Sequence, residues 1–168
     1  MSTCKPQIPN RELNCLFTIS KLADRRQVSL ATLLEQTVAE LPKALRFPES
    51  ACAAIRLDTI QCTSEQFRHP PWMISEAITV GQNRIGIVEI GYLENHCSSE
   101  ESLFLDEERQ LLVLVAGIVG RVAARRRTET AFKESEDRFR SLVEGSQTGI
   151  SIVQDDEVVY QNPEQARL

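Results

Sequence analysis

The longest helical pattern in the chain covers residues 106–143, contains no proline, and restricts the fold more than any other feature. Apolar side chains recur in it at heptad spacing, with polar residues in the middle of the repeat. The first (a) positions are Leu111, Ile118, Arg125, Phe132 and Phe139, and the fourth (d) positions are Leu114, Arg121, Thr128, Ser135 and Leu142. The pattern predicts a long helix with the seam of a parallel dimeric coiled coil, able to shift because the seam is partly polar. The alternative is a long helix whose first half packs on its own sheet.

Acidic residues mark the expected start of this helix. Asp106 is the predicted N-cap, and Glu107 and Glu108 stand in the first turn, where the helix dipole favours anions. Two other acidic clusters, Glu100–Glu101 and Asp155–Glu157, lie at loop or turn positions. Because paired carboxylates do acid–base chemistry only in a cleft that perturbs them, we interpret all three clusters as turn and helix-start residues.

Two shorter helices and a meander of strands are predicted ahead of the long helix. A helical period begins at Arg11, and Ser29 is placed to cap a second helix over residues 30–45, which Pro42 should end or kink. After Pro48 the period shortens toward two, which is typical of strands. The predicted strands are Ala51–Asp58, Thr59–Thr63, Met73–Val80 and Ile85–Tyr92, with a turn at Gly81–Arg84. This order of elements predicts an α+β domain with an antiparallel sheet flanked by helices.

The pattern changes again after Gly145. Gly149–Gln154 and Val158–Gln161 are predicted strands that form a hairpin, and Asn162–Pro163 is predicted to start a helix, with proline at its first position. A two-stranded hairpin of this size is marginally stable by itself.

Charge and composition exclude several classes of protein. The 168 residues include 19 basic and 24 acidic side chains, so the net charge of −5 gives no broad positive field for nucleic acid. The basic cluster of Arg109, Arg121 and Arg125–Arg127 is interpreted as a solvated helix surface. No apolar run is long enough to insert in a membrane, and Met1–Asn10 is not a secretory signal. The five cysteines indicate free thiols in a reducing compartment, which predicts a cytoplasmic protein.

The first three quarters of the chain resemble the GAF family of sensory domains. The resemblance is carried by RELNCLFTISKLADRRQVSLATLLEQTVAELPKAL, WMISEAITVGQNRIGIVEIGYLE and FLDEERQLLVLVAGIVGRVAARRR, and the hairpin followed by DEERQLL is its most specific part. The block order is similar to that of compact GAF domains beside PAS domains in microbial sensor histidine kinases. The resemblance implies that a ligand, where one binds, lies between the sheet and a covering segment.

The remaining residues resemble the start of a PAS domain. The carriers are the entry-helix residues Glu136, Arg140, Leu142, Val143 and Glu144, the strand Gly149–Val153, and Tyr160–Pro163. We therefore expect a lead-in at residues 1–10, a GAF-like domain at 11–124, a helical linker at 125–144 and an incomplete PAS domain at 145–168. The later PAS elements are missing, which suggests a piece of a larger sensor.

The sequence contains no recognisable catalytic or metal-binding set. The two histidines, His69 and His96, lack the context of a phosphoacceptor, and no P-loop or nucleophile elbow is present. His96 and Cys97 are adjacent, so their side chains diverge in an extended chain, and no CxxC pair occurs. Cys52 and Cys62 are interpreted as small buried hydrophobic residues.

Three aromatic residues are candidates for lining a ligand pocket, namely Phe67, Trp72 and Tyr92. The covering segment implied by the resemblance is Cys62–Ile74. The alternative is that Trp72 and Tyr92 are core residues. The cofactor and the ligand are not identified by the sequence.

These patterns support three hypotheses of function. The first is a sensory module that relays binding of a small molecule or partner through a dimeric helix, with no catalysis of its own. The residues expected to hold the homodimer are Leu111, Leu114, Ile118, Phe132 and Leu142. The second is a ligand-free structural dimerisation domain. The third is a thiol enzyme of the GAF fold, as in free methionine sulfoxide reductases, for which Cys62 and Cys97 are the available thiols.

Overall fold

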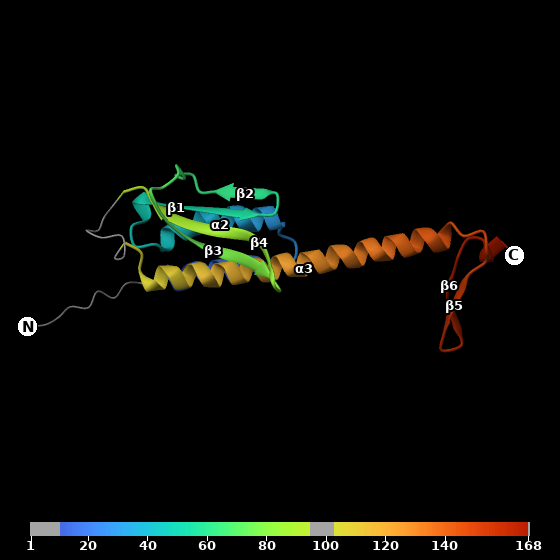
Figure 1. Cartoon of the computed structure of the whole chain (residues 1–168). Coiled ribbons are helices and arrows are strands. Elements are labelled where there is room, and N and C mark those ends of the chain that lie inside the picture. Colours follow the sequence, from blue (N-terminus) through green and yellow to red (C-terminus); the bar gives the residue numbers. More distant parts are fainter. Residues whose placement is uncertain (1–10, 95–102, 168) are drawn as a thin grey trace, which may run out of the picture. The chain divides into compact units, whose positions relative to one another are not determined.

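The computed structural model describes residues 11–94 and 103–167. It confirms the predicted α+β class, with an antiparallel four-stranded sheet and one long C-terminal helix (Figure 1). The chain divides into two compact units, Met1–Ala124 and Arg125–Leu168. The first is called the sheet domain and the second the hairpin unit, and each is described separately.

Two short helices precede the sheet. Helix α1 spans Arg11–Asp24 and α2 spans Leu30–Ala44, followed by a short 3-10 turn, η1, at Pro48–Ser50. Ser29 caps α2 as predicted, because its side chain accepts a hydrogen bond of 3.0 Å from the Thr32 N–H. Pro42 lies inside the last turn of α2, and the helix ends two residues beyond it.

The four strands form an antiparallel sheet in the order β2-β1-β4-β3. Their bounds are Ala51–Leu57 for β1, Ile60–Thr63 for β2, Trp72–Val80 for β3 and Asn83–Tyr92 for β4. The predicted turn at Gly81–Arg84 is too long, because Asn83 and Arg84 already pair with β3. A two-residue turn suffices here, since Gly81 adopts a φ of +60° that glycine tolerates without strain.

The inner face of the sheet belongs to the hydrophobic core that the three helices share. Ala53, Ile55, Val88 and Ile90 belong to one buried cluster with side chains of α1, α2 and α3. Helix α3 spans Asp106–Glu144, and its first half runs along the sheet beside β3 and β4 (Figure 1). A Cβ atom on Gly120 would lie 2.6 Å from the Thr79 carbonyl oxygen, so glycine allows this close approach of helix to strand.

The segment after β2 covers the outer face of the sheet at the positions where the strands carry small residues. Cys52 and Ala54 are buried on this face. Gly91, also on the outer face, meets the Pro70 ring so closely that a Cβ atom would be 2.4 Å from it. Beside them Arg56 Nη2 forms an ion pair of 3.1 Å with the buried carboxylate of Glu89. The covering segment therefore lies directly on the sheet at Cys52 and Gly91.

The hairpin unit contains the second half of α3 and a two-stranded sheet. Strand β5 spans Ser151–Gln154 and pairs with β6, Glu157–Gln161. The turn between them consists of Asp155 and Asp156, both with positive φ, which is the backbone of a tight hairpin turn. The helix predicted after Asn162 is only a single 3-10 turn, η3, at Gln165–Arg167.

Candidate functional site: the two anchored ends of helix α3

The start of α3 is fixed by a buried carboxylate. Glu108 is fully buried, and its Oε1 accepts hydrogen bonds from the Tyr92 hydroxyl at 2.6 Å and from the Arg46 N–H at 2.8 Å. Its Oε2 accepts a third, of 2.9 Å, from the Leu105 N–H. The sequence predicts Glu108 as a first-turn residue, which is confirmed, but its side chain is an internal acceptor and not a solvated one.

The geometry also corrects the predicted cap. The Leu105 carbonyl accepts the first helical hydrogen bond, from the Arg109 N–H at 3.1 Å, so Leu105 is the cap residue and Asp106 is the first helical residue. Leu105 has no side-chain oxygen to satisfy the free N–H groups of the first turn. Glu108, at the third helical position, reaches back to the Leu105 N–H as in a capping box.

The environment of Tyr92 keeps its phenol protonated. Its ring packs against Phe47 at 5.7 Å and Phe104 at 5.2 Å between centroids, and the residue is fully buried. Burial, followed by the hydrogen bond to the Glu108 carboxylate, raises the pKa of Tyr92 far above its usual value near 10. The hydroxyl is therefore a permanent donor that holds the end of β4 against the start of α3.

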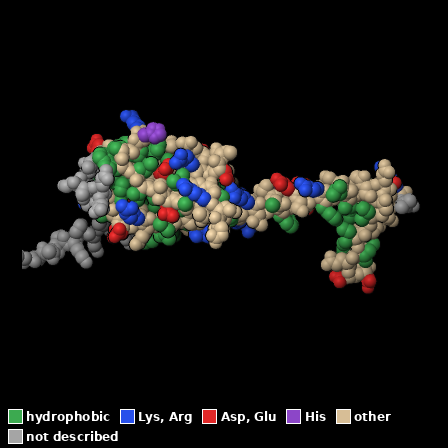
Figure 2. Space-filling model, in the orientation of Figure 1, with side chains coloured by type: hydrophobic (Ala, Val, Ile, Leu, Met, Phe, Trp, Pro, Cys, Tyr) green, Lys and Arg blue, Asp and Glu red, His purple; other side chains and the backbone are tan. Residues whose placement is uncertain are grey.

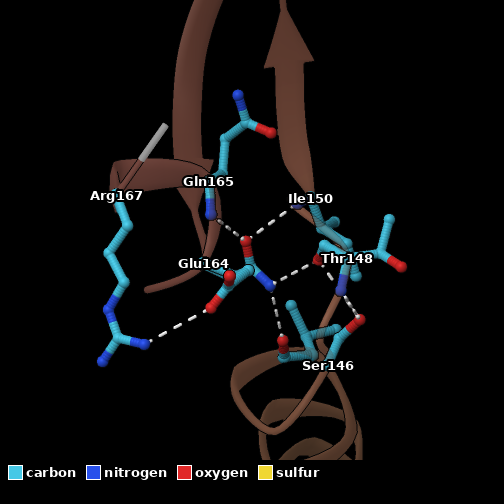
Figure 3. A network of polar contacts seen from close by, with 8 residues as sticks. Ser146, Thr148, Ile150, Glu164, Gln165 and Arg167 are labelled. Atoms are coloured by element: carbon cyan, nitrogen blue, oxygen red, sulfur yellow. Dashed lines mark hydrogen bonds and ion pairs between the residues drawn. The ribbon is translucent and has the colours of Figure 1, made fainter.

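The end of α3 is fixed by a buried amide. Asn162 is fully buried, and its Nδ2 donates hydrogen bonds of 3.0 Å to the carbonyls of Val143 and Thr148. Its Oδ1 accepts from the Ile150 N–H at 2.8 Å and from the Gln165 N–H at 3.0 Å (Figure 3). All four hydrogen-bonding positions of the amide are occupied.

Asn162 therefore joins the last turn of α3 to the hairpin. The Val143 carbonyl belongs to the set that a helix leaves unsatisfied at its C-terminus, and the side chain of Asn162 satisfies it. Pro163 follows directly, and the side chain of Asn162 also accepts the hydrogen bond from the Gln165 N–H, where η3 begins. The predicted helix start with proline at its first position is wrong, because Pro163 and Glu164 form a turn and η3 begins only at Gln165. The bond to Val143 has no signal in the sequence.

Between its two ends, α3 changes from buried to exposed. Of the residues predicted to hold a dimer, Leu111 and Ile118 are 1% and 8% exposed and lie in the core of the sheet domain. Because their own domain covers them, they are not available to a second copy. Leu114, Phe132 and Leu142 are 52%, 72% and 71% exposed. The alternative of a helix whose first half packs on its own sheet thus describes the first half of α3.

The three predicted pocket residues are not brought together. Trp72 and Tyr92 are paired across β3 and β4 and pack on the inner, helix-covered side of the sheet. Phe67 belongs to the covering segment, where its ring contacts His69. A depression of about 330 Å³ in the sheet domain contains none of the three. Its lining residues are Ala39, Pro42, Lys43, Pro48, Ala51, Ser64, Glu65 and Gln66.

The described thiols are buried and poor nucleophiles. Burial, with the charge of Glu40 next, raises the pKa of Cys15 to about 12, and burial also raises the pKa values of Cys52 and Cys62. A raised pKa lowers the thiolate fraction at neutral pH, and the thiolate is the reactive form. Cys97, the other thiol considered for catalysis, and His96 lie outside the described residues.

Neither a metal site nor a membrane span is found in the described ranges 11–94 and 103–167. No group of three His, Cys, Asp or Glu side chains gathers there as possible metal ligands. No described helix has the length and apolar character needed to cross a bilayer. A scan against protein-family models finds no match to the chain, and a search of the curated proteins finds none either.

Proposed function

We propose that this chain is a signal-relay module. The sheet domain determines the position of α3, and α3 transmits a change in that position to the hairpin unit. The observation that carries the proposal is the continuity of α3, a helix of 39 residues that begins in the core of one unit and ends in the other. A helix propagates displacement along its axis because its backbone is hydrogen-bonded throughout.

The contacts at the two helix ends support a relay. Glu108 connects the start of α3 to Tyr92 at the end of β4 and to Arg46 after α2, so a shift of either element moves the helix start. Asn162 connects the end of α3 to the hairpin through Val143 and Ile150. A small molecule or partner that displaces the sheet has, in this proposal, a direct connection to α3.

The resemblance to GAF and PAS domains suggests the kind of larger protein to which this module belongs. We place the module in a cytoplasmic sensor of the histidine-kinase type, with α3 paired to a second copy and the output enzyme elsewhere. The described cysteines, Cys15, Cys52 and Cys62, are free thiols, in agreement with a reducing compartment. The proposal assigns no catalysis to this chain.

The relay is tested by hydrogen exchange along α3 in dilute protein. Tyr92→Phe removes one bond to Glu108 and leaves the ring packing in place. The relay predicts faster exchange of amides 125–144, which lie outside the sheet domain. Val38→Ala is the control, because Val38 is buried in the same core on α2 but makes none of the hydrogen bonds that hold Glu108. A change confined to the sheet domain in both variants would contradict the relay.

One observation favours a second candidate, a ligand-free dimerisation domain. The outer face of the sheet is closed at Cys52, Ala54 and Gly91, where the resemblance implies a ligand. A thermal-shift screen against metabolites separates the two candidates. A ligand that raises the unfolding temperature of the sheet domain and changes exchange at residues 125–144 supports the ligand-driven relay, and no stabilising ligand supports the dimerisation domain.

A further inference from the structure

We propose that the depression at the end of α2 is a binding site for a small zwitterion, a molecule with the size and charges of a free α-amino acid. The depression has a volume of about 330 Å³, and it is lined by the end of α2, by η1 with the start of β1, and by residues 64–66 after β2. Ligand pockets measure about 300–1,000 Å³, so this one suits a small metabolite better than a nucleotide.

Two prolines give the depression rigid apolar walls. Pro42 lies in the last turn of α2 and Pro48 begins η1, and both are partly buried. Ala39 and Ala51 add methyl groups to the same lining. Because proline has a fixed φ and no flexible side chain, these walls lose little conformational entropy when a ligand binds. They fit a short aliphatic side chain.

Among the described residues, one cation and one anion line the depression, and they come from different elements. Lys43 belongs to the last turn of α2, and Glu65 belongs to the segment after β2. Glu65 repels an anionic ligand and Lys43 repels a cationic one, whereas a zwitterion satisfies both charges. Ser64 and Gln66 add a hydroxyl and an amide to the lining.

Both charged side chains are accessible to a ligand. Lys43 Nζ forms an ion pair of 2.6 Å with Glu40, and the Lys43 side chain is 66% exposed. Exposed ion pairs contribute little to stability, so the ammonium group can also bind a ligand carboxylate at small cost. The side chains of Glu65 and Gln66 are exposed and form no ion pair or hydrogen bond with the described part of the chain.

The segment that carries Glu65 is held against the sheet by its neighbours. Ser64 Oγ accepts a hydrogen bond of 3.0 Å from the Ala53 N–H, and the Ser64 N–H donates one of 2.9 Å to the Ala53 carbonyl. The Phe67 N–H donates to the Ser64 carbonyl at 3.0 Å and closes a turn over Glu65 and Gln66. The anionic side of the depression is therefore preformed.

The chain between Pro42 and Pro48 lines the depression and also holds the start of α3. The Leu45 N–H donates to the Pro42 carbonyl at 3.2 Å, and the next residue, Arg46, donates its N–H to Glu108 at 2.8 Å. A ligand that contacts both prolines therefore acts on the connection that fixes α3. The inference names the ligand site of the relay proposed above, and it rests on the relay in this consequence alone.

The site differs from the ligand position that the resemblance implies. That position lies between the sheet and its covering segment, where the outer face is closed at Cys52 and Gly91. The depression is lined instead by α2, whose buried side chains belong to the core on the inner side, and only residues 64–66 of the covering segment contribute.

Calorimetric titration of the full chain with L-valine tests the charge requirement. N-acetyl-L-valine keeps the carboxylate but loses the ammonium group, and L-valinamide keeps the ammonium group but loses the carboxylate. We expect L-valine to bind, and each derivative to bind at least about tenfold more weakly, because each leaves one charged side chain without a partner. Equal binding of the three compounds, or no binding of L-valine at about 10 mM, would overturn the site.

Two variants test the residues, and two others are matched controls. Lys43→Met and Glu65→Gln each remove one charge and keep the size of the side chain, and each should weaken L-valine binding at least about tenfold. Lys133→Met and Glu35→Gln make the same changes at exposed positions outside the depression and should leave binding unchanged. Equal effects of the site variants and the controls would contradict the assignment.

Hydrogen exchange with saturating L-valine separates the site from the relay. Binding with changed exchange at residues 125–144 supports both. Binding with unchanged exchange there supports the site and contradicts a relay driven from it. If L-valine does not bind while Tyr92→Phe still changes exchange at residues 125–144, the site is overturned and the relay stands.

Discussion

The two halves of α3 share one backbone and one heptad repeat, yet they have opposite surroundings. In residues 106–124 the buried side chains include Leu111, Leu112, Val115 and Val119, which form a wide apolar stripe. In residues 125–144 the only buried side chain is Val143. A wide stripe is typical of a helix on a domain core, and a narrow a and d stripe is typical of a helix–helix seam. The width of the stripe, and not its period, distinguishes the two halves.

The hairpin unit also differs from the sheet domain in how many of its large apolar side chains are exposed. Seven of its large hydrophobic side chains are exposed, and Figure 2 shows hydrophobic side chains gathered over the hairpin. They are Phe132, Phe139, Leu142, Ile152, Val153, Val158 and Val159. A groove of about 300 Å³ lies among Phe139, Val143, Ile152 and Tyr160. Such surface is typical of units that contact other molecules.

The largest expected effect comes from a matched pair of leucines in the two halves of the helix. Leu111→Ala should lower the free energy of unfolding of the sheet domain by about 2–5 kcal/mol, because it leaves a cavity in the core. Leu142 belongs to the same heptad repeat but is 71% exposed. Leu142→Ala should therefore change the free energy of unfolding by less than about 0.5 kcal/mol in dilute protein. Urea unfolding followed by Trp72 fluorescence and circular dichroism measures both. Equal losses would remove the distinction between the halves.

Two glycines in the buried half of α3 test how closely that half packs against the sheet. Gly120→Ala should destabilise the sheet domain by about 1–3 kcal/mol, because the new methyl group would meet the Thr79 carbonyl at 2.6 Å. Gly117→Ala should instead stabilise it, by up to about 1 kcal/mol, because alanine favours helix and the nearest atom is 3.6 Å away on the flexible Arg121 side chain. Thermal unfolding shows the two signs, and a stabilising Gly120→Ala would refute the close approach of α3 to β3.

The side-chain amide of Asn162, which binds the last turn of α3, should affect the stability of the hairpin unit alone. Asn162→Asp removes both Nδ2 donors and places an oxygen against the Val143 and Thr148 carbonyls, which should destabilise the hairpin by about 1–3 kcal/mol. Gln161→Glu makes the same change of charge at an exposed neighbour and is the control. Exchange of amides 151–161 should rise in the first variant alone. Unchanged exchange there would show that Asn162 does not hold the hairpin to α3.

The Tyr92 hydroxyl tests a single hydrogen bond at the start of α3. Tyr92→Phe should lower the stability of the sheet domain by about 1.5–3 kcal/mol at neutral pH, because the lost hydrogen bond goes to a buried carboxylate. The pKa of Tyr92 is raised in the folded state, so its contribution is complete below pH 10 and is lost as the pH rises further. Urea midpoints measured above pH 10 should fall more steeply for the natural chain than for the variant. Urea midpoints that fall equally with pH in the natural chain and in the variant would contradict a raised pKa of Tyr92 in the folded state.

Much of the fold could be predicted from the sequence because it depends on local patterns. The Ser29 cap, the hairpin of β3 and β4 and the length of α3 all follow from residues close together in the chain. The turn between β3 and β4 is shorter than predicted, since one glycine with a positive φ is enough.

The anchored ends of α3 could not be predicted in the same way. The sequence predicts Glu108 as a helix-start residue, but its partners Arg46 and Tyr92 stand 62 and 16 residues away. No serine or threonine marks the cap, because Leu105 occupies that position. Asn162 could be recognised as the residue before Pro163, yet its bond to Val143 spans 19 residues. Long-range hydrogen bonds of single polar side chains leave no periodic signal in a sequence.

The central claim, that α3 is a core helix in its first half and an exposed pairing surface in its second, is tested most directly by hydrogen exchange of the natural chain at two concentrations. We predict that amides 108–123 are strongly protected at both, while amides 128–142 exchange rapidly in dilute protein and become protected as the concentration rises. Uniform protection of the whole helix, or fast exchange of residues 128–142 that no concentration slows, would contradict the claim.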